Sequence, residues 1–301
     1  MPQNINNDMK ISVVTPCYNM EKYIEGTIIS VLSQNYDNLE YIIVDGGSTD
    51  SSMEIINKYR DKIAVVISEP DHGMYDAIAK GFAIATGDIF AYINADDTYF
   101  PHTFRLVNEI FTANSEIDWI GGRPAYINEN RNLTDIFPQV GAKRSKDIAR
   151  GYFHQNAYGF LMQESMFWRK ELYIKSGGIN GSLRLAGDFD LWRRFAQFAE
   201  FIPVDVPLAA FMRRNESISK TQKERYLTEI ASLYGNALPY PDFLWKLISK
   251  NKKFTVLRRL ITYRKGIMLQ YSVKRKSFVK ISFCNNVSYH TFKSAIRYFK
   301  V

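Results

Sequence analysis

The sequence predicts an α/β fold built on a doubly wound, mostly parallel sheet that is followed by a basic extension. Short apolar runs rich in β-branched residues alternate with segments of helical periodicity over about the first hundred residues, and the links between them are short. Parallel strands joined by crossover helices produce this alternation. With 301 residues, the chain is long enough for one large domain with an appendage.

Each element of this fold is predicted from a local pattern. Four strands are expected where short apolar runs are bounded by polar residues, at 11–15, 41–45, 63–67 and 89–93. Three helices are expected between them, where apolar side chains recur at helical spacing, at 20–34, about 50–60 and 76–85. Asn19 is a candidate N-cap for the first of these helices, and Asp50 for the second.

The second half of the chain has a looser pattern. Glycine and proline punctuate short strands and loops from about 118 to 150. The elements expected farther on are helices at 163–176, 187–199 and 222–234 and a strand at 201–206. Pro239 and Pro241 then predict a boundary between a main domain over 1–241 and a basic, largely helical extension over 242–301.

Charge is distributed unevenly between these two parts. Residues 243–301 hold 15 Lys and Arg and no acidic residue, whereas 1–242 hold 24 basic and 31 acidic residues. The net charge of +8 therefore combines a body of −7 with an extension of +15. The sequence has no run of 18 apolar residues, and the two cysteines, Cys17 and Cys284, suit a reducing compartment. We expect a cytoplasmic protein.

The basic extension also has the pattern of an amphipathic helix. The apolar residues that would share one side of that helix are Phe254, Leu257, Leu260 and Ile261. A basic amphipathic helix is typical of binding to an anionic membrane, so we expect residues 243–301 to hold the protein on the inner face of the cell membrane. Nucleic-acid binding is the alternative, but the acidic body and the lack of a zinc, helix-turn-helix or RNP-type pattern argue against it.

Polar motifs follow the first, second and fourth predicted strands. They are Thr15-Pro16-Cys17-Tyr18-Asn19, Asp45-Gly46-Gly47-Ser48-Thr49-Asp50 and Asn94-Ala95-Asp96-Asp97. Ligands of parallel sheets bind beyond the carboxyl ends of the strands, so we expect one shared site. Tyr18 can stack on a base, Asp45 can accept a hydrogen bond from a base N–H, and two adjacent carboxylates can hold a divalent cation. The combination predicts binding of a nucleoside diphosphate.

Several of these residues also have a plain structural interpretation. Tyr18 by itself would more often be a packed aromatic, and the Asp96-Asp97 pair is compatible with a simple turn and cap. Asp190 is expected to pair with one of the two arginines that follow it. Gln163-Glu164 is equally compatible with a functional site and with a helix cap.

In this order and spacing, T-P-C-Y-N, V-D-G-G-S-T-D and N-A-D-D resemble the motifs of family 2 glycosyltransferases with a GT-A fold. The likeness continues through D-H-G-M-Y-D-A at 71–77 and G-G-I-N-G-S-L-R-L-A-G-D-F-D-L-W at 177–192, and it covers roughly residues 9–235. Within the family, the sequence is most similar to bacterial enzymes that build O-antigen, capsule or colanic-acid-type polysaccharides. The resemblance implies transfer of a sugar from a nucleotide-sugar, most readily a UDP-sugar, to a hydroxyl of a lipid-linked glycan.

The resemblance also implies roles for individual residues. The nucleobase pocket would be formed by Thr15, Pro16, Tyr18 and Asp45. Asp96 and Asp97 would be the DXD-type pair, one touching ribose and the other a Mn²⁺ or Mg²⁺ ion. Asp188 would be the catalytic base of a single inverting displacement, taking the proton of the acceptor hydroxyl.

Three departures from the family pattern concern the metal and the base. Asn94 stands where the DXD frame usually begins with Asp, and Gly187 stands where Glu usually precedes the base. Arg214 falls near a position at which many relatives place a metal-binding His. An arginine cannot ligate a cation but can bind a diphosphate directly. We therefore expect metal dependence to persist in weakened form.

A fourth departure concerns the donor. Ala77-Ile78-Ala79 replaces an Ala-Arg-Asn of relatives, and Asp71 or Lys80 is expected to supply the missing donor contacts. A nucleotide-sugar-binding protein without transfer activity remains the alternative to an enzyme.

Overall fold

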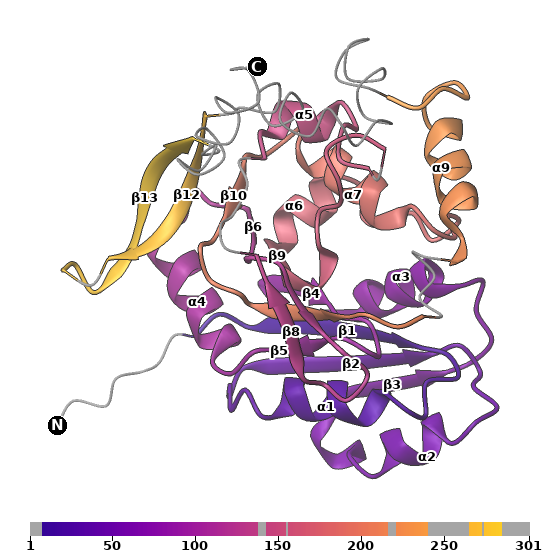
Figure 1. Ribbon diagram of the computed structural model, residues 1–301. Coiled ribbons are helices and arrows are strands. Elements are labelled where there is room, and N and C mark those ends of the chain that lie inside the picture. Colours follow the sequence, from indigo (N-terminus) through magenta and orange to yellow (C-terminus); the bar gives the residue numbers. More distant parts are fainter. Residues whose placement is uncertain are drawn as a thin grey trace, which may run out of the picture.

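Figure 1 shows the computed structural model of the chain, which describes residues 8–137, 143–154, 156–215, 221–239, 265–272 and 274–284. A seven-stranded sheet forms its centre, in the order β10-β6-β9-β4-β1-β2-β3. The strands are β1 (Ile11–Cys17), β2 (Leu39–Asp45), β3 (Val65–Ser68), β4 (Ile89–Tyr92), β6 (Trp119–Gly121), β9 (Met166–Arg169) and β10 (Phe201–Pro203). Only β9 runs antiparallel to its neighbours in this sheet. The predicted mostly parallel α/β sheet is confirmed.

Successive residues of the central strands face two different apolar cores. In β1, Ile11 and Val13 belong to one core and Val14 to the other. In β2, Ile43 and Val44 are divided in the same way. Because both faces are covered, these strands are nearly uninterrupted apolar runs, which is the pattern that predicts them.

Helices cover both faces of the sheet (Figure 1). One face is covered by α1 (Ile24–Leu32), α2 (Ser52–Asn57) and α4 (Thr103–Ala113). The other face is covered by α3 (Met74–Ile84), α5 (Ser145–Ala149), α6 (Lys170–Lys175) and α7 (Gly187–Phe195). A short 3-10 turn, η1 (Arg60–Lys62), follows α2, and α9 (Lys223–Ser232) packs on the start of α7 through Ile230. Asn19 is not a helix cap, because α1 begins at Ile24 and the Asn19 Oδ1 accepts a hydrogen bond from the Thr49 N–H.

The prediction of a helix over 163–176 is wrong for the first half of that segment. The segment forms a 3-10 turn, η2 (Gln163–Ser165), then strand β9, and only then α6. In β9, Phe167 joins one core while Met166 and Trp168 join the other. A strand that is buried on both sides shows no polar alternation, so hydropathy alone does not separate it from a buried helix. Helix α4 was not predicted, and the strand expected over 201–206 ends at Pro203.

A second sheet of four short strands lies beside the central one. Its order is β5-β11-β7-β8, with β5 (Thr98–Tyr99), β11 (Ala209–Met212), β7 (Ala125–Ile127) and β8 (Leu133–Ile136). This sheet matters for the site because β11 carries the chain to Arg213 and Arg214, next to the end of β4.

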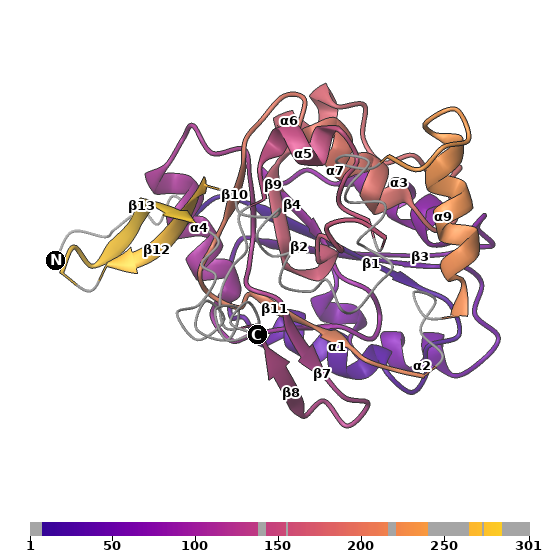
Figure 2. The same ribbon diagram turned by 45° about the horizontal axis from the view of Figure 1, so that its top comes forward.

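The described part of the basic extension is a hairpin and not a helix. Strands β12 (Lys265–Ser272) and β13 (Ser277–Cys284) pair antiparallel along their whole length. Leu269 is fully buried in the main core, and its carbonyl accepts a 2.9 Å hydrogen bond from the Asp205 N–H. Figures 1 and 2 place this hairpin and α9 at opposite ends of the molecule. The predicted amphipathic face at 254–261 lies outside the described residues.

Within the described ranges, no helix combines the length and the apolar character needed to cross a bilayer.

Candidate active site

The three polar motifs meet at one edge of the central sheet, as predicted. Strands β1 and β2 end in register, with Cys17 opposite Asp45, and the Gly46 N–H donates a 2.8 Å hydrogen bond to the Cys17 carbonyl. Strand β4 pairs with β1 as far as Tyr92, so the Asn94–Asp97 motif follows at the same edge. The topology therefore assembles residues that are far apart in the sequence.

Asp45 organises the loop that follows β2. The side chain is fully buried, and its Oδ2 accepts hydrogen bonds from Gly47 N (3.1 Å), Ser48 N (3.0 Å) and Ser68 Oγ (2.8 Å), while Oδ1 accepts from the Ser48 hydroxyl. Asp45 thus accepts three hydrogen bonds from the loop and one from Ser68 of β3, which is most of the capacity of a carboxylate. Asp45 therefore shapes the wall of the site from within.

The other predicted nucleobase residues differ in exposure. Thr15 is fully buried and its Oγ1 accepts a 3.1 Å hydrogen bond from the Tyr41 hydroxyl. Pro16 is buried in β1. Tyr18 is 59% exposed, so its ring stands in solvent directly after the strand. Of these residues, Tyr18 presents a free face to a ligand.

Asp71 and Lys80 both lie near the loop after β2. A Cβ on Gly46 would lie 2.5 Å from Asp71 Oδ2, so glycine at position 46 allows this close approach. The Lys80 Nζ donates a 3.3 Å hydrogen bond to the carbonyl of Pro70, next to Asp71, and forms ion pairs with Glu69 (2.8 Å) and Asp76 (3.6 Å). Asp71 thus faces the loop directly, while the nearby Lys80 ammonium is already paired with two carboxylates.

Asp96 is paired with Arg214, the residue predicted to stand in for a metal-binding His. The Asp96 Oδ2 lies 2.6 Å from an Arg214 nitrogen, and the guanidinium also stacks 4.7 Å from the centre of the Tyr23 ring. Burial raises the pKa of Asp96, and the Arg214 charge opposes that rise. A cation and a carboxylate from distant parts of the chain therefore share the end of β4.

Asp97 is a structural anchor in this state. It is fully buried; Oδ1 accepts a 2.9 Å hydrogen bond from the Met212 N–H and Oδ2 a 3.0 Å bond from Gln163 Nε2. Its carbonyl accepts bonds from Thr27 Oγ1 (2.7 Å) and Arg131 (3.4 Å). Burial, together with the Asp96 and Glu164 charges, holds the pKa of Asp97 well above its ordinary value. One side chain thus ties β4 to β11 and η2.

These two carboxylates do not fit a metal ion as they stand. Asp96 is occupied by Arg214, and both oxygens of Asp97 accept hydrogen bonds from the protein. Among the described residues, no three His, Cys, Asp or Glu side chains form a cluster able to hold a cation. The Mn²⁺ or Mg²⁺ site expected at Asp96 and Asp97 is therefore not formed by the described residues alone.

Asp188 lies at the start of α7 with one oxygen held and the other free. Its Oδ1 accepts hydrogen bonds from the Phe189 N–H (2.7 Å) and the Tyr75 hydroxyl (3.1 Å), and its Oδ2 accepts none from the described residues. Burial raises the pKa of Asp188 to about 6, and the two hydrogen bonds partly oppose this. A fixed carboxylate with a free oxygen and a pKa near neutrality has the properties of a general base.

Packing explains why the residue before Asp188 is a glycine. A Cβ at Gly187 would lie 2.5 Å from the Tyr75 ring, so the ring that donates to Asp188 occupies the space of a side chain at 187.

Glu229 fastens the loop in front of α7, a role that the sequence did not reveal. From α9, its carboxylate accepts hydrogen bonds of 2.7–2.8 Å from the N–H groups of Arg184, Leu185 and Ala186. No motif marks a carboxylate that contacts only backbone 43–45 residues away, so spacing alone does not identify it.

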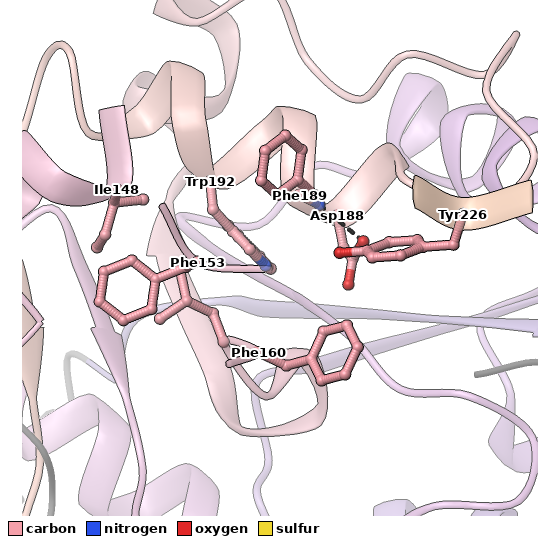
Figure 3. Close-up of a pocket in the computed structure, with 8 residues that line it drawn as sticks. Ile148, Phe153, Phe160, Asp188, Phe189, Trp192 and Tyr226 are labelled. Carbon is pink, nitrogen blue, oxygen red and sulfur yellow. Dashed lines mark hydrogen bonds between the residues drawn. The ribbon is translucent and has the colours of Figure 1, made fainter. Parts of the chain in front are cut away.

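An aromatic pocket opens beside Asp188 (Figure 3). It is lined by Ile148, Phe153, Phe160, Leu161, Asp188, Phe189, Trp192 and Tyr226. The Trp192 indole nitrogen points into the space between Phe160 and Asp188, and no hydrogen-bond partner satisfies it. All of the lining residues follow position 147, whereas the predicted nucleotide contacts other than Arg214 precede position 98. The pocket and most of the predicted nucleotide contacts thus come from different parts of the sequence, and Asp188 belongs to the pocket.

Glu164 is a second residue whose importance the sequence left open. It is fully buried in η2, and neither carboxylate oxygen has a hydrogen-bond partner among the described residues.

The predicted pairing of Asp190 is confirmed by ion pairs with Arg193 (3.0 Å) and Arg194 (2.9 Å). Asp50 is not the N-cap residue of α2, which is Ser51, but its Oδ1 accepts a 2.9 Å hydrogen bond from the Ser52 N–H at the start of that helix.

Comparison with known sequences identifies relatives of this chain. The profile of glycosyl transferase family 2 matches residues 12–169. A Nostoc sp. protein named "uncharacterized glycosyltransferase" is 33% identical over 172 residues, which are 56% of this chain and 53% of that protein. A Mycobacterium tuberculosis "PGL/p-HBAD biosynthesis glycosyltransferase" is 24% identical over 60% of this chain and 66% of its own length. The match to the Nostoc relative thus spans about half of that protein.

Solved structures share the fold. S. aureus TarS residues 1–349 in complex with UDP-GlcNAc superpose with a TM-score of 0.59 at 18% identity, over 76% of this chain and 66% of that one. The mannosyltransferase PcManGT of Pyrobaculum calidifontis was solved with GDP-Man and Mn²⁺. It superposes with a TM-score of 0.55 at 17% identity, over 85% of this chain and 73% of that one. The predicted GT-A fold is confirmed. Because the family profile covers more than half of its length, the chain belongs to glycosyl transferase family 2.

Proposed function

We propose that the protein is an inverting glycosyltransferase with Asp188 as its catalytic base. The proposal rests chiefly on Asp188, whose Oδ1 is held by Tyr75 and Phe189 while Oδ2 is free. Residues 1–241 would form the catalytic domain, and 242–301 an extension that associates with a membrane.

At the donor end, the base would stack on the exposed Tyr18 ring, within a pocket that also includes Thr15, Pro16 and the Asp45 loop. Asp71 reaches this pocket across Gly46. Both Asp45 oxygens already accept hydrogen bonds from the protein, so Asp45 would contact the base most simply by exchanging the bond from Ser48 or Ser68. Asp96 would accept from a ribose hydroxyl once the diphosphate has drawn Arg214 away from it.

The reaction is a single displacement. The acceptor hydroxyl gives its proton to Asp188 Oδ2 as its oxygen forms a bond to the anomeric carbon of the donor sugar. The bond from that carbon to the diphosphate oxygen breaks, and its electron pair leaves with the nucleoside diphosphate. Arg214 neutralises part of the new charge on the departing group. Attack from the face opposite the leaving group inverts the configuration of the sugar.

A UDP-sugar is the first choice of donor. The TarS complex with UDP-GlcNAc supports it, while PcManGT was solved with GDP-Man on the same fold. A divalent cation belongs to the PcManGT complex, but the described carboxylates do not hold one unaided. We therefore expect Mn²⁺ or Mg²⁺ to stimulate transfer only weakly, with the diphosphate bound mainly by Arg214.

The acceptor would be a lipid-linked glycan of a cell-surface polysaccharide, such as O-antigen or a colanic-acid-type polymer. Of the rings that line the pocket beside Asp188, Phe160 is exposed and offers a face on which a sugar can pack. A basic extension of +15 supports attachment to the anionic inner face of the membrane, where such acceptors are assembled.

Substitution of Asp188 by Asn tests the proposal. It keeps size and polarity but removes the base, so nucleotide release should fall by about a hundredfold or more, while UDP-sugars still raise the melting temperature as in the wild type. Asp190→Asn is a poor control because it breaks two ion pairs; Asp61→Asn, on the exposed η1, is a suitable one. Equal turnover in Asp188→Asn would exclude this residue as base. Donor binding without turnover in the wild type would indicate a binding protein.

A further inference from the structure

Glu164 stands apart from the other acids of the site because neither of its carboxyl oxygens forms a hydrogen bond within the described ranges. Asp45, Asp96, Asp97 and Asp188 each accept hydrogen bonds or pair with a cation. Glu164 is fully buried, and among the described residues both of its oxygens lack a hydrogen-bond partner. The charge of Lys143 opposes the rise that burial causes in the pKa of Glu164, but no lysine or arginine of the described residues lies within ion-pair distance of it. A buried carboxyl group without hydrogen bonds is costly, so a polar ligand that supplies them would stabilise it.

The position of Glu164 is fixed by its neighbours. Gln163 donates a 3.0 Å hydrogen bond to Asp97, and Ser165 Oγ donates a 3.4 Å bond to the Ala209 carbonyl, so η2 is tied at both ends. Burial raises the pKa of Glu164 to about 8; the Lys143 charge opposes this rise, and the charges of Asp188 and Asp96 add to it. The Glu164 charge in turn adds to the rise that burial causes in the pKa of Asp97. Glu164 therefore lies close to both the diphosphate end of the site and the base.

In the proposed displacement, the transferred sugar lies between the diphosphate and Asp188. Its anomeric carbon is bonded to the diphosphate and is attacked by the oxygen that Asp188 deprotonates. Resting on this proposed function, we propose that Glu164 binds the transferred sugar of the donor, its two oxygens accepting hydrogen bonds from adjacent hydroxyls of the ring. Two adjacent sugar hydroxyls match a carboxyl group whose two oxygens have no hydrogen-bond partner among the described residues. A divalent cation is the weaker occupant, since the described acids form no group able to hold one.

Access to Glu164 requires movement. The carboxyl group has no exposed surface, so a sugar contacts it only after covering side chains shift.

The test compares Glu164→Gln with the wild type and with Glu171→Gln, an exposed glutamate on α6. The probes are UDP, UDP-glucose, UDP-galactose and UDP-N-acetylglucosamine, and the readouts are the affinity for UDP and the kcat/KM for each UDP-sugar. We expect the Gln variant to keep its affinity for UDP within about twofold and to lose kcat/KM for the sugar donor by about 10- to 100-fold. Glu171→Gln should match the wild type in both.

Deoxy analogues of the donor that is turned over separate contact from a structural effect. Removing the contacted hydroxyl should lower kcat/KM about tenfold for the wild type and leave the Gln variant unchanged. Equal sensitivity of both proteins to every deoxy analogue would overturn the assignment, as would a parallel loss of UDP affinity or a fall in melting temperature for Glu164→Gln. If no UDP compound binds the wild type, it is the proposed function that fails, and the role of Glu164 fails with it.

Discussion

At the scale of single residues, the acids of this site differ in how much of their hydrogen-bonding capacity the protein already uses. Both oxygens of Asp45 and both oxygens of Asp97 accept hydrogen bonds from the protein, so these residues act as anchors. Only one oxygen of Asp188 accepts hydrogen bonds from the described residues, and neither oxygen of Glu164 does. The sequence marks all of them as acidic residues, but only the structure shows which oxygens remain free for a substrate.

The raised pKa of Asp188 predicts the pH dependence of transfer. A base must be ionised to accept a proton, and burial raises the pKa of Asp188 to about 6. The kcat/KM for the donor should therefore be constant above this pH and fall about tenfold per unit below it. An ordinary aspartate would show the fall only below about pH 4.

Tyr75→Phe provides the matching variant. The Tyr75 hydroxyl stabilises the ionised form of Asp188 through a 3.1 Å hydrogen bond, so its loss should raise the pKa of Asp188 and move the midpoint of the pH profile upward. A midpoint that moves downward, or stays in place, would mean that the profile reports another group.

At the scale of elements, the position of the base depends on contacts between α7 and α9. Glu229 on α9 accepts three hydrogen bonds from the backbone just before α7, and Ile230 packs beside Phe189 and Ala186. The loop from Arg184 to Ala186 thus gains its shape from a helix more than 35 residues farther along the chain.

Glu229→Ala should loosen this connection. Three N–H groups lose a charged acceptor, and water replaces part of it, so we expect a loss of about 1–3 kcal/mol in the free energy of unfolding. Because Asp188 is then less well fixed, kcat should fall more than donor affinity. Thermal unfolding and steady-state kinetics measure both effects. Glu224→Ala, an exposed glutamate on the same helix, should leave them unchanged; equal losses in the two variants would exclude a specific role for Glu229.

The individual elements also show how much of the fold and of the site could be predicted from the sequence. The strands β1, β2 and β4 and the motifs that follow them were predictable, because a buried parallel strand has a distinctive apolar run and its carboxyl end carries the polar residues. Strand β9 was not, since residues buried on both sides lack the alternation that separates strand from helix. The roles of Glu229 and Glu164 depend on tertiary contacts, and no spacing encodes these.

At the scale of the whole molecule, the basic extension and the main domain are joined more closely than their charges suggest. Leu269 of the hairpin is buried in the main core, and Lys280 pairs with Glu116 of the main domain. Deleting 243–301 would therefore also remove part of the core, and lost membrane binding would not be a specific result. Substitution of exposed charges is the better test.

The turn of the hairpin carries three adjacent exposed cations, Lys274, Arg275 and Lys276. If the extension binds anionic lipid, replacing all three by alanine should cost about 1 kcal/mol per residue and weaken sedimentation with phosphatidylserine vesicles by up to about a hundredfold. The control replaces Lys58, Arg60 and Lys62, which are exposed near the end of α2. If both triple variants bind alike, the hairpin is not the membrane contact.

The central claim is a single displacement in which Asp188 activates the acceptor. The stereochemistry of the first product tests it most directly, and proton NMR can follow it with water as the acceptor, by identifying the anomer that is released before mutarotation. From an α-linked UDP-sugar, we predict that the β anomer is released first. The Asp188→Asn variant should release no sugar, so it should give no anomeric proton signal. Initial release of the α anomer would contradict a single displacement and, with it, the role assigned to Asp188.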